Sequence, residues 1–365
     1  MELRADGGTR GTDADVDATG ATGAGATGAG GPGSGGSGSG GSPPEQKSVI
    51  KWIGSGKYSD VFLVSNGRKH MAMKISYYRD DTVCKFVDRI KAGDLTGALR
   101  AKQTDAIAVG SEFSKFTRGI MDTVTPHFVL VFCDVDCKSF AERLPLLTKT
   151  RLDDLTPFQR RYNNVCFMEV YSCDMTKYLS RSTYDERTLR TLIFQVLYTI
   201  AAMQKLLPGW RHNDLSTNNV LVKKLRKHVA ASYTIRLSNA ASPTTFYTDT
   251  PIFIAINDYD FVHVPDHPRL ENQRVMGGNY KVDGRDNKSY DACFFLKSVL
   301  RCIAKKPRKD FAKTVEFLKG IGLRDEDRQN EEIPSLKPLT LLANPYFAPL
   351  KKKISVSSAF EIPPT

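Results

Sequence analysis

The apolar residues of this 365-residue chain change their spacing partway along it, and this change limits the folds open to the chain. Between residues 48 and 78 apolar and polar residues alternate on both sides of a glycine-containing turn and again after "SNGRKH", which predicts three short antiparallel strands. Residues 185–207 instead carry apolar side chains at helical spacing and end before Pro208 and Gly209. The sequence therefore predicts an α+β protein with a small β-rich part and a larger α-helical part.

The remaining segments extend this plan. Residues 84–121 lose the alternation and are predicted helical, with "SEFSKFTRGIM" as the clearest amphipathic piece. "PHFVLVFCDV" and "NNVCFMEVY" are predicted strands, and the second half has helices predicted at "DMTKYLSR", "SYDACFFLKSVLRCIA" and "DFAKTVEFLKGIGL". Residues 223–250, rich in Ser, Thr and Ala, are predicted to form an inserted excursion.

The cysteine pattern and the lack of a signal-peptide core at the N-terminus predict a protein of a reducing compartment. Residues 1–46 are Gly-, Ala- and Ser-rich and offer almost nothing to bury, so we predict a disordered tail. The seven cysteines show no Cys-x-x-Cys pair and no zinc-type spacing, and no window has the ~18–20 apolar residues of a membrane span. We expect an intracellular protein without a membrane span.

The formal net charge of +12 is carried by the folded part. The first 17 residues hold five acidic and two basic residues, a net of −3, so the rest of the chain carries +15. A surface this basic favours acidic partners, namely nucleotides, phosphoproteins, nucleic acid or an anionic membrane, and the charge alone does not choose among them.

Two features of the β-rich part suit a phosphate ligand. Gly54 and Gly56 lie in the turn of "IGSGKYSDVFLV", where exposed backbone amides suit phosphate oxygens, and Val61 follows where it could cover a flat base. Lys74 is a single cation in an apolar strand, which is costly unless an anion lies beside it. A plain glycine hairpin and a lysine that extends to water are the alternatives.

Two polar clusters border apolar strands in the second half. "HNDLSTNNVLV" holds Asp214 and Asn219 five residues apart before a strand, and "IAINDYDFVHV" places Asp258 and Asp260 directly after one. Carboxylates in such positions have little structural use, so these residues are candidates for a functional role.

These segments resemble the eukaryotic-type protein kinase superfamily. "GSGKYSDV" with "AMK" is similar to its glycine-rich loop and strand-three lysine, "HNDLSTNN" to its catalytic loop, and "NDYDF" to its metal-binding segment, in the family's order over residues 50–305. The resemblance implies a bilobal fold, with a small antiparallel β-sheet and one key helix in the N-lobe and a mainly α-helical C-lobe. The domains implied are the tail at 1–46, an N-lobe with hinge at 47–171, a C-lobe at 172–350 and a C-terminal tail at 351–365.

The resemblance also assigns roles to residues. It implies ATP and Mg²⁺ as cofactors, with Asp214 as catalytic base, Lys74 on the phosphates, and Asn219 and Asp258 on the metal. Asp260 is the competing choice for the metal-binding aspartate, or a second ligand. The other residues expected at the nucleotide are Ile53, Gly54, Ser55, Gly56, Ser59, Val61, Ala72, Glu112, Met168, Glu169, Tyr171, Asp174 and Leu221.

Some of these assignments have plain structural alternatives. Glu112 is expected either to pair with Lys74 or to lie on a solvated helix face, and "CFMEVY" is either a hinge with Met168 as gatekeeper or an ordinary buried strand. Asp291 is expected either to brace the catalytic loop or simply to begin a helix, and His212 to support that loop.

The chain also departs from the family pattern. Asn213 and Ser216 replace an arginine and a lysine of the family's catalytic loop, and we find no Ala-Pro-Glu motif. We expect activity without activation-segment phosphorylation, a protein substrate with a Ser or Thr hydroxyl, and no requirement for nucleic acid. Likeness to divergent viral kinases implies a large DNA virus, and so the cytoplasm or nucleus of an infected cell. A choline- or aminoglycoside-kinase-like enzyme and a catalytically inactive pseudokinase scaffold are the alternatives.

Overall fold

The computed structural model describes most of the chain after the N-terminal tail. The described residues are 49–362 without 57, 67–68, 104, 145–146, 148–151, 238–241, 279–281, 283, 285, 307 and 324–332. The predicted disordered tail, residues 1–46, lies outside them. No helix among the described residues has the length and apolar character needed to cross a bilayer.

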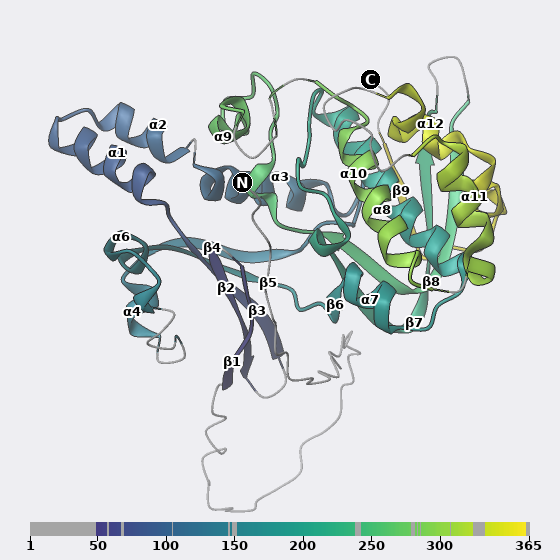
Figure 1. The fold of residues 1–365 in the computed structure, drawn as a ribbon, viewed down its shortest axis with the longest axis horizontal. Helices are drawn as coiled ribbons and strands as arrows, with labels where there is room; N and C mark the ends of the chain where they lie inside the picture. The colour runs from purple at the N-terminus through teal and green to yellow at the C-terminus, as the bar shows by residue number, and fades with distance from the viewer. Residues whose placement is uncertain are drawn as a thin grey trace, which may run out of the picture.

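A five-stranded antiparallel sheet in the order β1-β2-β3-β5-β4 forms the N-lobe (Figure 1). The three strands predicted from the alternation are confirmed. The strands are β1 (Val49–Gly56), β2 (Ser59–Asn66), β3 (Lys69–Tyr77), β4 (Val131–Lys138) and β5 (Tyr162–Met168).

The predicted strand at "PHFVLVFCDV" is wrong at its start, because β4 begins only at Val131. Ile256 donates its backbone N–H to the carbonyl of His127 at 2.9 Å, and Phe128 forms an isolated bridge with Ile256. The first residues of that apolar run therefore pair with the C-lobe rather than with the N-lobe sheet.

The segment between β3 and β4, predicted as helical, contains three helices: α1 (Asp80–Lys91), α2 (Leu95–Gln103) and α3 (Ala106–Ile120). Gly93 adopts a φ of 77°, in the left-handed region that favours glycine, and separates α1 from α2. Asp105 begins α3 by accepting a hydrogen bond from the backbone of Ile107. Figure 1 shows α1 and α2 extending away from the molecule, whereas α3 lies against the C-lobe, where Phe113 joins the main core.

Short helices α4 (Phe140–Arg143) and α6 (Pro157–Arg161) lie on the side of the N-lobe sheet that faces away from the C-lobe (Figure 1). The C-lobe is built around α8 (Glu186–Leu206), whose side chains are buried continuously from Leu189 to Met203. The helices around it are α7 (Met175–Arg181), α9 (Gln273–Met276), α10 (Tyr290–Ile303), α11 (Ala312–Gly320) and α12 (Pro338–Ala343). The predicted helices of this half are confirmed at α7, α8 and α10, while α11 covers only part of its predicted segment.

A second sheet lies in the C-lobe. It contains β6 (Cys173–Asp174), β7 (Val220–Ile235), β8 (Thr244–Ile256) and β9 (Ser358–Glu361), with β7 paired to the other three. The segment 223–250, predicted as an inserted excursion, therefore continues β7 and β8 as a long hairpin. Tyr233 and Phe246 are buried on this hairpin and pack on Phe194 of α8, which explains why the strands extend so far.

The architecture confirms the predicted bilobal, protein-kinase-like α+β fold. A small antiparallel sheet with one helix, α3, against the C-lobe precedes a mainly helical C-lobe. The exact domain boundaries given above stay predictions.

Candidate functional site

The glycine-containing turn joins β1 to β2. Gly54 faces Val61 and Gly56 faces Ser59 in the antiparallel register, while Ile53 and Ser55 are exposed. A Cβ atom added at Gly54 would meet nothing within 4 Å, so this backbone is open to a ligand. The turn is thus accessible, as a phosphate-covering loop must be.

One apolar cluster brings together residues of both lobes that the sequence assigned to the nucleotide. Ala72 and Met168 are buried in it, and Val61, Tyr171 and Leu221 pack against it. These residues come from β2, β3, β5, the connection after β5, and β7. They form an apolar surface between the lobes of the kind that receives a flat base.

The connection between the lobes carries a polar contact that the sequence did not reveal. Tyr171 donates its hydroxyl to Glu169 Oε2 at 2.9 Å, and Lys223 Nζ lies 2.5 Å from Glu169 Oε1. The backbone N–H of Glu169 is bonded to the carbonyl of Leu130 at 2.9 Å. Lys223 lies 54 positions from Glu169, so no local pattern could have predicted the pair.

Asp174 lies where this connection enters the C-lobe. Its Oδ1 accepts the backbone N–H of Lys177 at 2.7 Å and caps α7. The structure therefore gives Asp174 a capping role, and its predicted contact with a ribose stays a prediction.

An ion pair joins the two lobes at the centre of the site. Lys74 Nζ of β3 lies 3.0 Å from Asp258 Oδ1, directly after β8. Burial alone would lower the pKa of Lys74, but the charges of Asp258 and Asp260 outweigh it and raise the pKa. The same pair lowers the pKa of Asp258. Both groups are therefore held in their charged forms.

The structure separates the two competing aspartates. Asp258 forms the ion pair with Lys74 and adopts a left-handed φ of 65°, which Asp and Asn tolerate best among residues other than glycine. Burial raises the pKa of Asp260, and its backbone carbonyl accepts a hydrogen bond from Asn272 Nδ2 at 2.9 Å. Asp258 is thus the carboxylate that contacts Lys74, and the charge of Asp260 is close enough to contribute to the raised pKa of Lys74.

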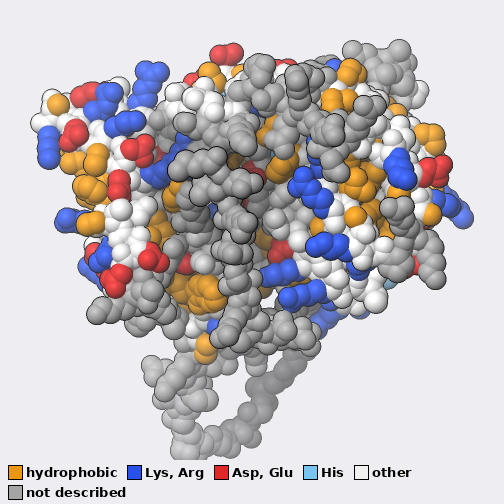
Figure 2. Space-filling model, in the orientation of Figure 1, with side chains coloured by type: hydrophobic (Ala, Val, Ile, Leu, Met, Phe, Trp, Pro, Cys, Tyr) orange, Lys and Arg blue, Asp and Glu red, His pale blue; other side chains and the backbone are white. Residues whose placement is uncertain are grey.

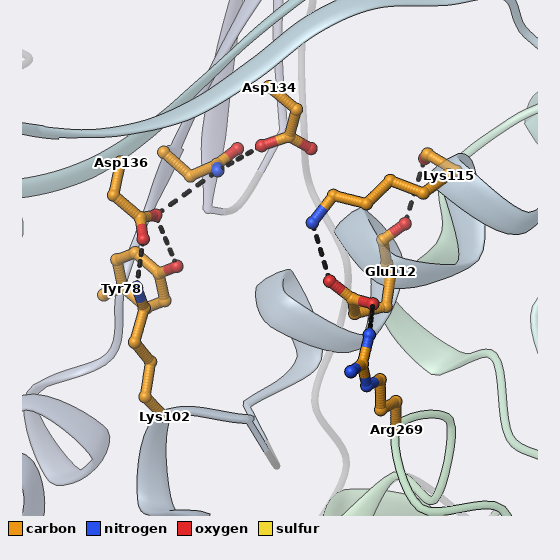
Figure 3. Close-up of polar contacts among 10 residues, drawn as sticks. Tyr78, Lys102, Glu112, Lys115, Asp134, Asp136 and Arg269 are labelled. Atoms are coloured by element: carbon orange, nitrogen blue, oxygen red, sulfur yellow. Dashed lines mark hydrogen bonds and ion pairs between the residues drawn. The ribbon is translucent and has the colours of Figure 1, made fainter. Parts of the chain in front are cut away.

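The prediction that Glu112 pairs with Lys74 is wrong for this structure. Glu112 lies on α3 but binds Lys115 Nζ at 2.6 Å and Arg269 at 3.4 Å, as Figure 3 shows. These contacts border a cavity of about 380 Å³ between α2, α3 and β4, whose opposite wall carries Asp134 and Asp136. Arg269 lies 157 positions after Glu112, which is why the sequence could not reveal this pairing.

The catalytic-loop residues lie together beside this ion pair. Asn219 Nδ2 donates to the Asp214 carbonyl at 2.7 Å and to Asp214 Oδ2 at 2.9 Å. Burial is the largest cause of a raised pKa at Asp214, and the charge of Asp258 adds to it while His212 opposes it. Asp214 and Asp258 are therefore close enough to repel one another, which a cation between them would relieve.

A buried carboxylate fixes the backbone of the loop at His212 and Asn213. Asp291, at the start of α10, accepts the backbone N–H groups of His212 at 2.7 Å and of Asn213 at 2.9 Å. His212 Nε2 contacts the carbonyl of Asn257 at 3.0 Å, which ties the loop to the residue before Asp258. The brace expected from Asp291 and the supporting contact expected from His212 are both present.

The carboxylate of Asp258 and the side-chain amide of Asn219 fit a magnesium ion that takes its other ligands from a bound nucleotide and water. Within the described part of the chain no three or more His, Cys, Asp or Glu side chains gather as a metal cluster. Mg²⁺ commonly takes one or two protein carboxylates and completes its shell with phosphates and water. Asp258, with the side-chain amide oxygen Oδ1 of Asn219, suits that arrangement, since Asn219 Nδ2 already donates to Asp214.

The chain is similar in sequence to a curated protein that is named as a kinase. No family model matches the chain. "Putative serine/threonine-protein kinase R400" of Acanthamoeba polyphaga mimivirus is 29% identical over 202 residues, which are 50% of this chain and 42% of that relative. This chain therefore spans less than half the length of the curated relative it matches. A solved kinase domain, 9% identical, covers 84% of this chain and 98% of its own, with a TM-score of 0.38.

The fold, the order of its motifs and the similarity to this relative support a divergent protein of the protein-kinase-like superfamily. The relative that carries the kinase name is a viral protein.

Proposed function

We propose that the protein is an ATP-dependent phosphotransferase that transfers the γ-phosphoryl group of Mg-ATP to a Ser or Thr hydroxyl of a protein. The observation that carries the proposal is the Lys74–Asp258 ion pair of 3.0 Å, formed between the lobes beside Asp214 and Asn219. A buried cation next to several carboxylates and an open glycine turn suits a metal-bound triphosphate.

Each group has a separate task in this proposal. The backbone from Gly54 to Ser59 covers the phosphates, and Val61, Ala72, Met168 and Leu221 enclose the base. Lys74 neutralises phosphate oxygens, and Asn219 and Asp258 hold magnesium, with Asp260 beside them. Magnesium, when bound, would offset the negative charge of the phosphate oxygens.

Asp214 then acts on the acceptor. It accepts the proton of the attacking hydroxyl as the new oxygen–phosphorus bond forms and the bond to the ADP oxygen breaks. A carboxylate with a raised pKa is a better proton acceptor than an ordinary one, provided that it is ionised at the working pH. Catalysis comes mainly from position and charge, with no covalent intermediate on the protein.

Asp214→Asn tests this role. The amide keeps the size of the side chain but cannot accept the proton, so we expect kcat to fall by about 10²–10⁴-fold with nucleotide binding nearly unchanged. Radiolabelled ATP with a Ser/Thr peptide library, and in parallel with a pool of small hydroxyl metabolites, measures transfer and the acceptor class. Calorimetry with Mg-ATP measures binding.

The matched control is Asn218→Ala, which changes an exposed residue of the same loop and should transfer at the wild-type rate. A wild-type rate for Asp214→Asn would refute the assignment of the base. Transfer to metabolites but not to peptides would show that the acceptor is a small molecule rather than a protein. Binding of Mg-ATP without any transfer by the wild type would indicate a catalytically inactive scaffold.

A further inference from the structure

A group of basic side chains lies on α7 and the first half of β7, beside the catalytic loop. We call it the basic strip; its members are Lys177, Arg181, Lys224, Arg226 and Lys227, all exposed. Figure 2 shows Lys and Arg side chains gathered over this region of the C-lobe. The proposed transfer reaction does not use these side chains.

The strip is one surface rather than scattered charges. Lys177 and Arg181 are four positions apart on α7 and so share a face of that helix. Burial raises the pKa of the Cys173 thiol, and Lys224, Lys177 and Arg181 partly offset that rise, so all three charges lie near this residue. Lys224 also donates its backbone N–H to Ser172 Oγ at 3.2 Å, directly before Cys173.

Arg226 and Lys227 continue the strip along β7. The pairing of β7 with β8 shifts its register between Lys224 and Val229, so these residues lie in an irregular stretch of the hairpin. An extended strand rises ~3.3 Å per residue, which puts Lys224 to Lys227 roughly 15–25 Å along the chain from Asn219. That span equals several residues of an extended peptide.

Two carboxylates near the strip pair with side chains outside it. Glu169 binds Lys223 at 2.5 Å, and Asp249 lies 3.1 Å from His228 Nδ1. Asp174 caps α7 and lies 3.8 Å from Lys177, a member of the strip. The five cations of the strip outnumber this carboxylate, and their positive potential favours an acidic partner.

The strip reaches the catalytic loop directly. Thr176, next to Lys177, shares a hydrogen bond of 2.7 Å with Thr217, which lies between Asp214 and Asn219. The first turn of α7, which carries Lys177, is therefore attached to the loop that holds Asp214. The described α7 and residues 220–229 expose no Phe, Tyr or Trp ring, since Tyr178 is buried, so nucleic-acid bases would find no stacking platform there.

We propose that the basic strip binds acidic residues flanking the acceptor hydroxyl of a protein substrate, so that the enzyme prefers acidic peptides. This inference rests on the proposed phosphotransfer to proteins and names its substrate class. The interaction is made by exposed charges, so it acts mainly on KM and weakens as salt rises.

The experiment compares two peptides that have the same Ser acceptor, one flanked by Glu and one by Gln. The variants are Lys224→Glu/Arg226→Glu/Lys227→Glu and its neutral counterpart with Gln at the same positions. A matched control, Lys313→Glu/Lys319→Glu, reverses exposed cations on α11. We expect the wild type to favour the Glu peptide, and the Glu variant to reduce the ratio of kcat/KM values about tenfold or more, mostly through KM.

The neutral variant should give a smaller reduction, and the α11 control should keep the wild-type ratio. Equal use of both peptides by the wild type, or an unchanged ratio in both strip variants, would overturn the proposal. It would also be overturned if the strip variants keep the ratio but lose affinity for a single-stranded oligonucleotide.

A binding measurement separates this inference from the proposed function. Fluorescence anisotropy of the labelled Glu peptide reports binding without turnover. Binding that needs the strip, with no transfer by the wild type, supports the strip and refutes the phosphotransferase. Transfer to both peptides alike supports the phosphotransferase and refutes the strip.

Discussion

The two lobes differ in how their side chains are packed. The C-lobe has one continuous core that extends from α3 and α8 through β7 and β8 to the C-terminal segment. The N-lobe sheet has separate smaller clusters, and its first strand is mostly exposed. Asp214, Asn219 and Asp258, which the proposed transfer requires in fixed positions, are attached to the continuous core, while Gly54 and Gly56 lie on the loosely packed strands.

This difference suggests a division of labour. A well-packed core is stiff and deforms little, whereas small clusters and exposed strands open at low energetic cost. We expect the metal- and acceptor-binding half of the site to be preformed and the nucleotide-covering half to adapt as it closes over a ligand.

The largest effect on stability is expected at the centre of the C-lobe. Phe194 is fully buried and contacts the rings of Tyr198, Tyr233, Phe246 and Phe347. Phe194→Ala should lower the free energy of unfolding by about 3–5 kcal/mol, because it leaves a cavity in a core that cannot collapse. Urea denaturation measures the change.

The N-lobe counterpart is Val83→Ala, in the small cluster with Tyr78 and Ile107. It should lower the free energy of unfolding by only about 1–2 kcal/mol, the value for two lost methyl groups. Equal losses for the two variants would contradict the contrast between the lobes.

A smaller effect concerns acid. His127 is buried, with Nδ1 3.1 Å from the Ile254 carbonyl and Nε2 2.9 Å from the Tyr233 hydroxyl, and burial lowers its pKa to about 3. Because the folded pKa lies below the unfolded value of ~6.5, its contribution is present above pH 6.5 and is lost as pH falls toward 3. The loss should reach about 2 kcal/mol at pH 5.

Urea denaturation at pH 7 and pH 5 tests this expectation for the wild type and His127→Gln. The variant should be less stable at pH 7 and should lose less between the two pH values. A His127→Gln protein as acid-sensitive as the wild type would show that other groups cause the loss.

The smallest effect is expected at Glu112. Its ion pairs with Lys115 and Arg269 are solvent-exposed and worth little, and it does not contact Lys74. Glu112→Gln should therefore change kcat/KM less than about fivefold in the phosphotransfer assay. Lys74→Met is the positive control, since it leaves Asp258 without its cation and should lower kcat/KM by about 10²-fold or more. A large loss for Glu112→Gln would mean that α3 rearranges to bring Glu112 to Lys74 during turnover.

Short segments were predictable from the sequence, and contacts across the chain were not. The sequence singled out Lys74, Asp214, Asn219 and Asp258 because each is a polar residue within or beside an apolar segment. The structure brings them close together, and their roles stay predictions. The partner of Glu112 and the Lys223–Glu169 contact depend on residues far apart in the sequence.

Pairing between lobes also explains the errors in the fold. The run from His127 to Leu130 is apolar enough for a strand of the N-lobe, but the backbone of β8 competes for it. The paired length of β7 and β8 depends on their packing against α8. The Ser- and Thr-rich sequence of 223–250 gives no sign of this packing.

The parallel pairing of β9 with β7 has a practical consequence. β6 covers Leu221 and Val222 of β7, and Ser358 to Glu361 cover Ala231 to Thr234. Glu361 also donates its backbone N–H to the Thr123 carbonyl after α3. A truncated protein that ends before Ser358 would expose unpaired backbone groups along β7, ready to join a strand of another molecule, so shortened versions made for expression should aggregate.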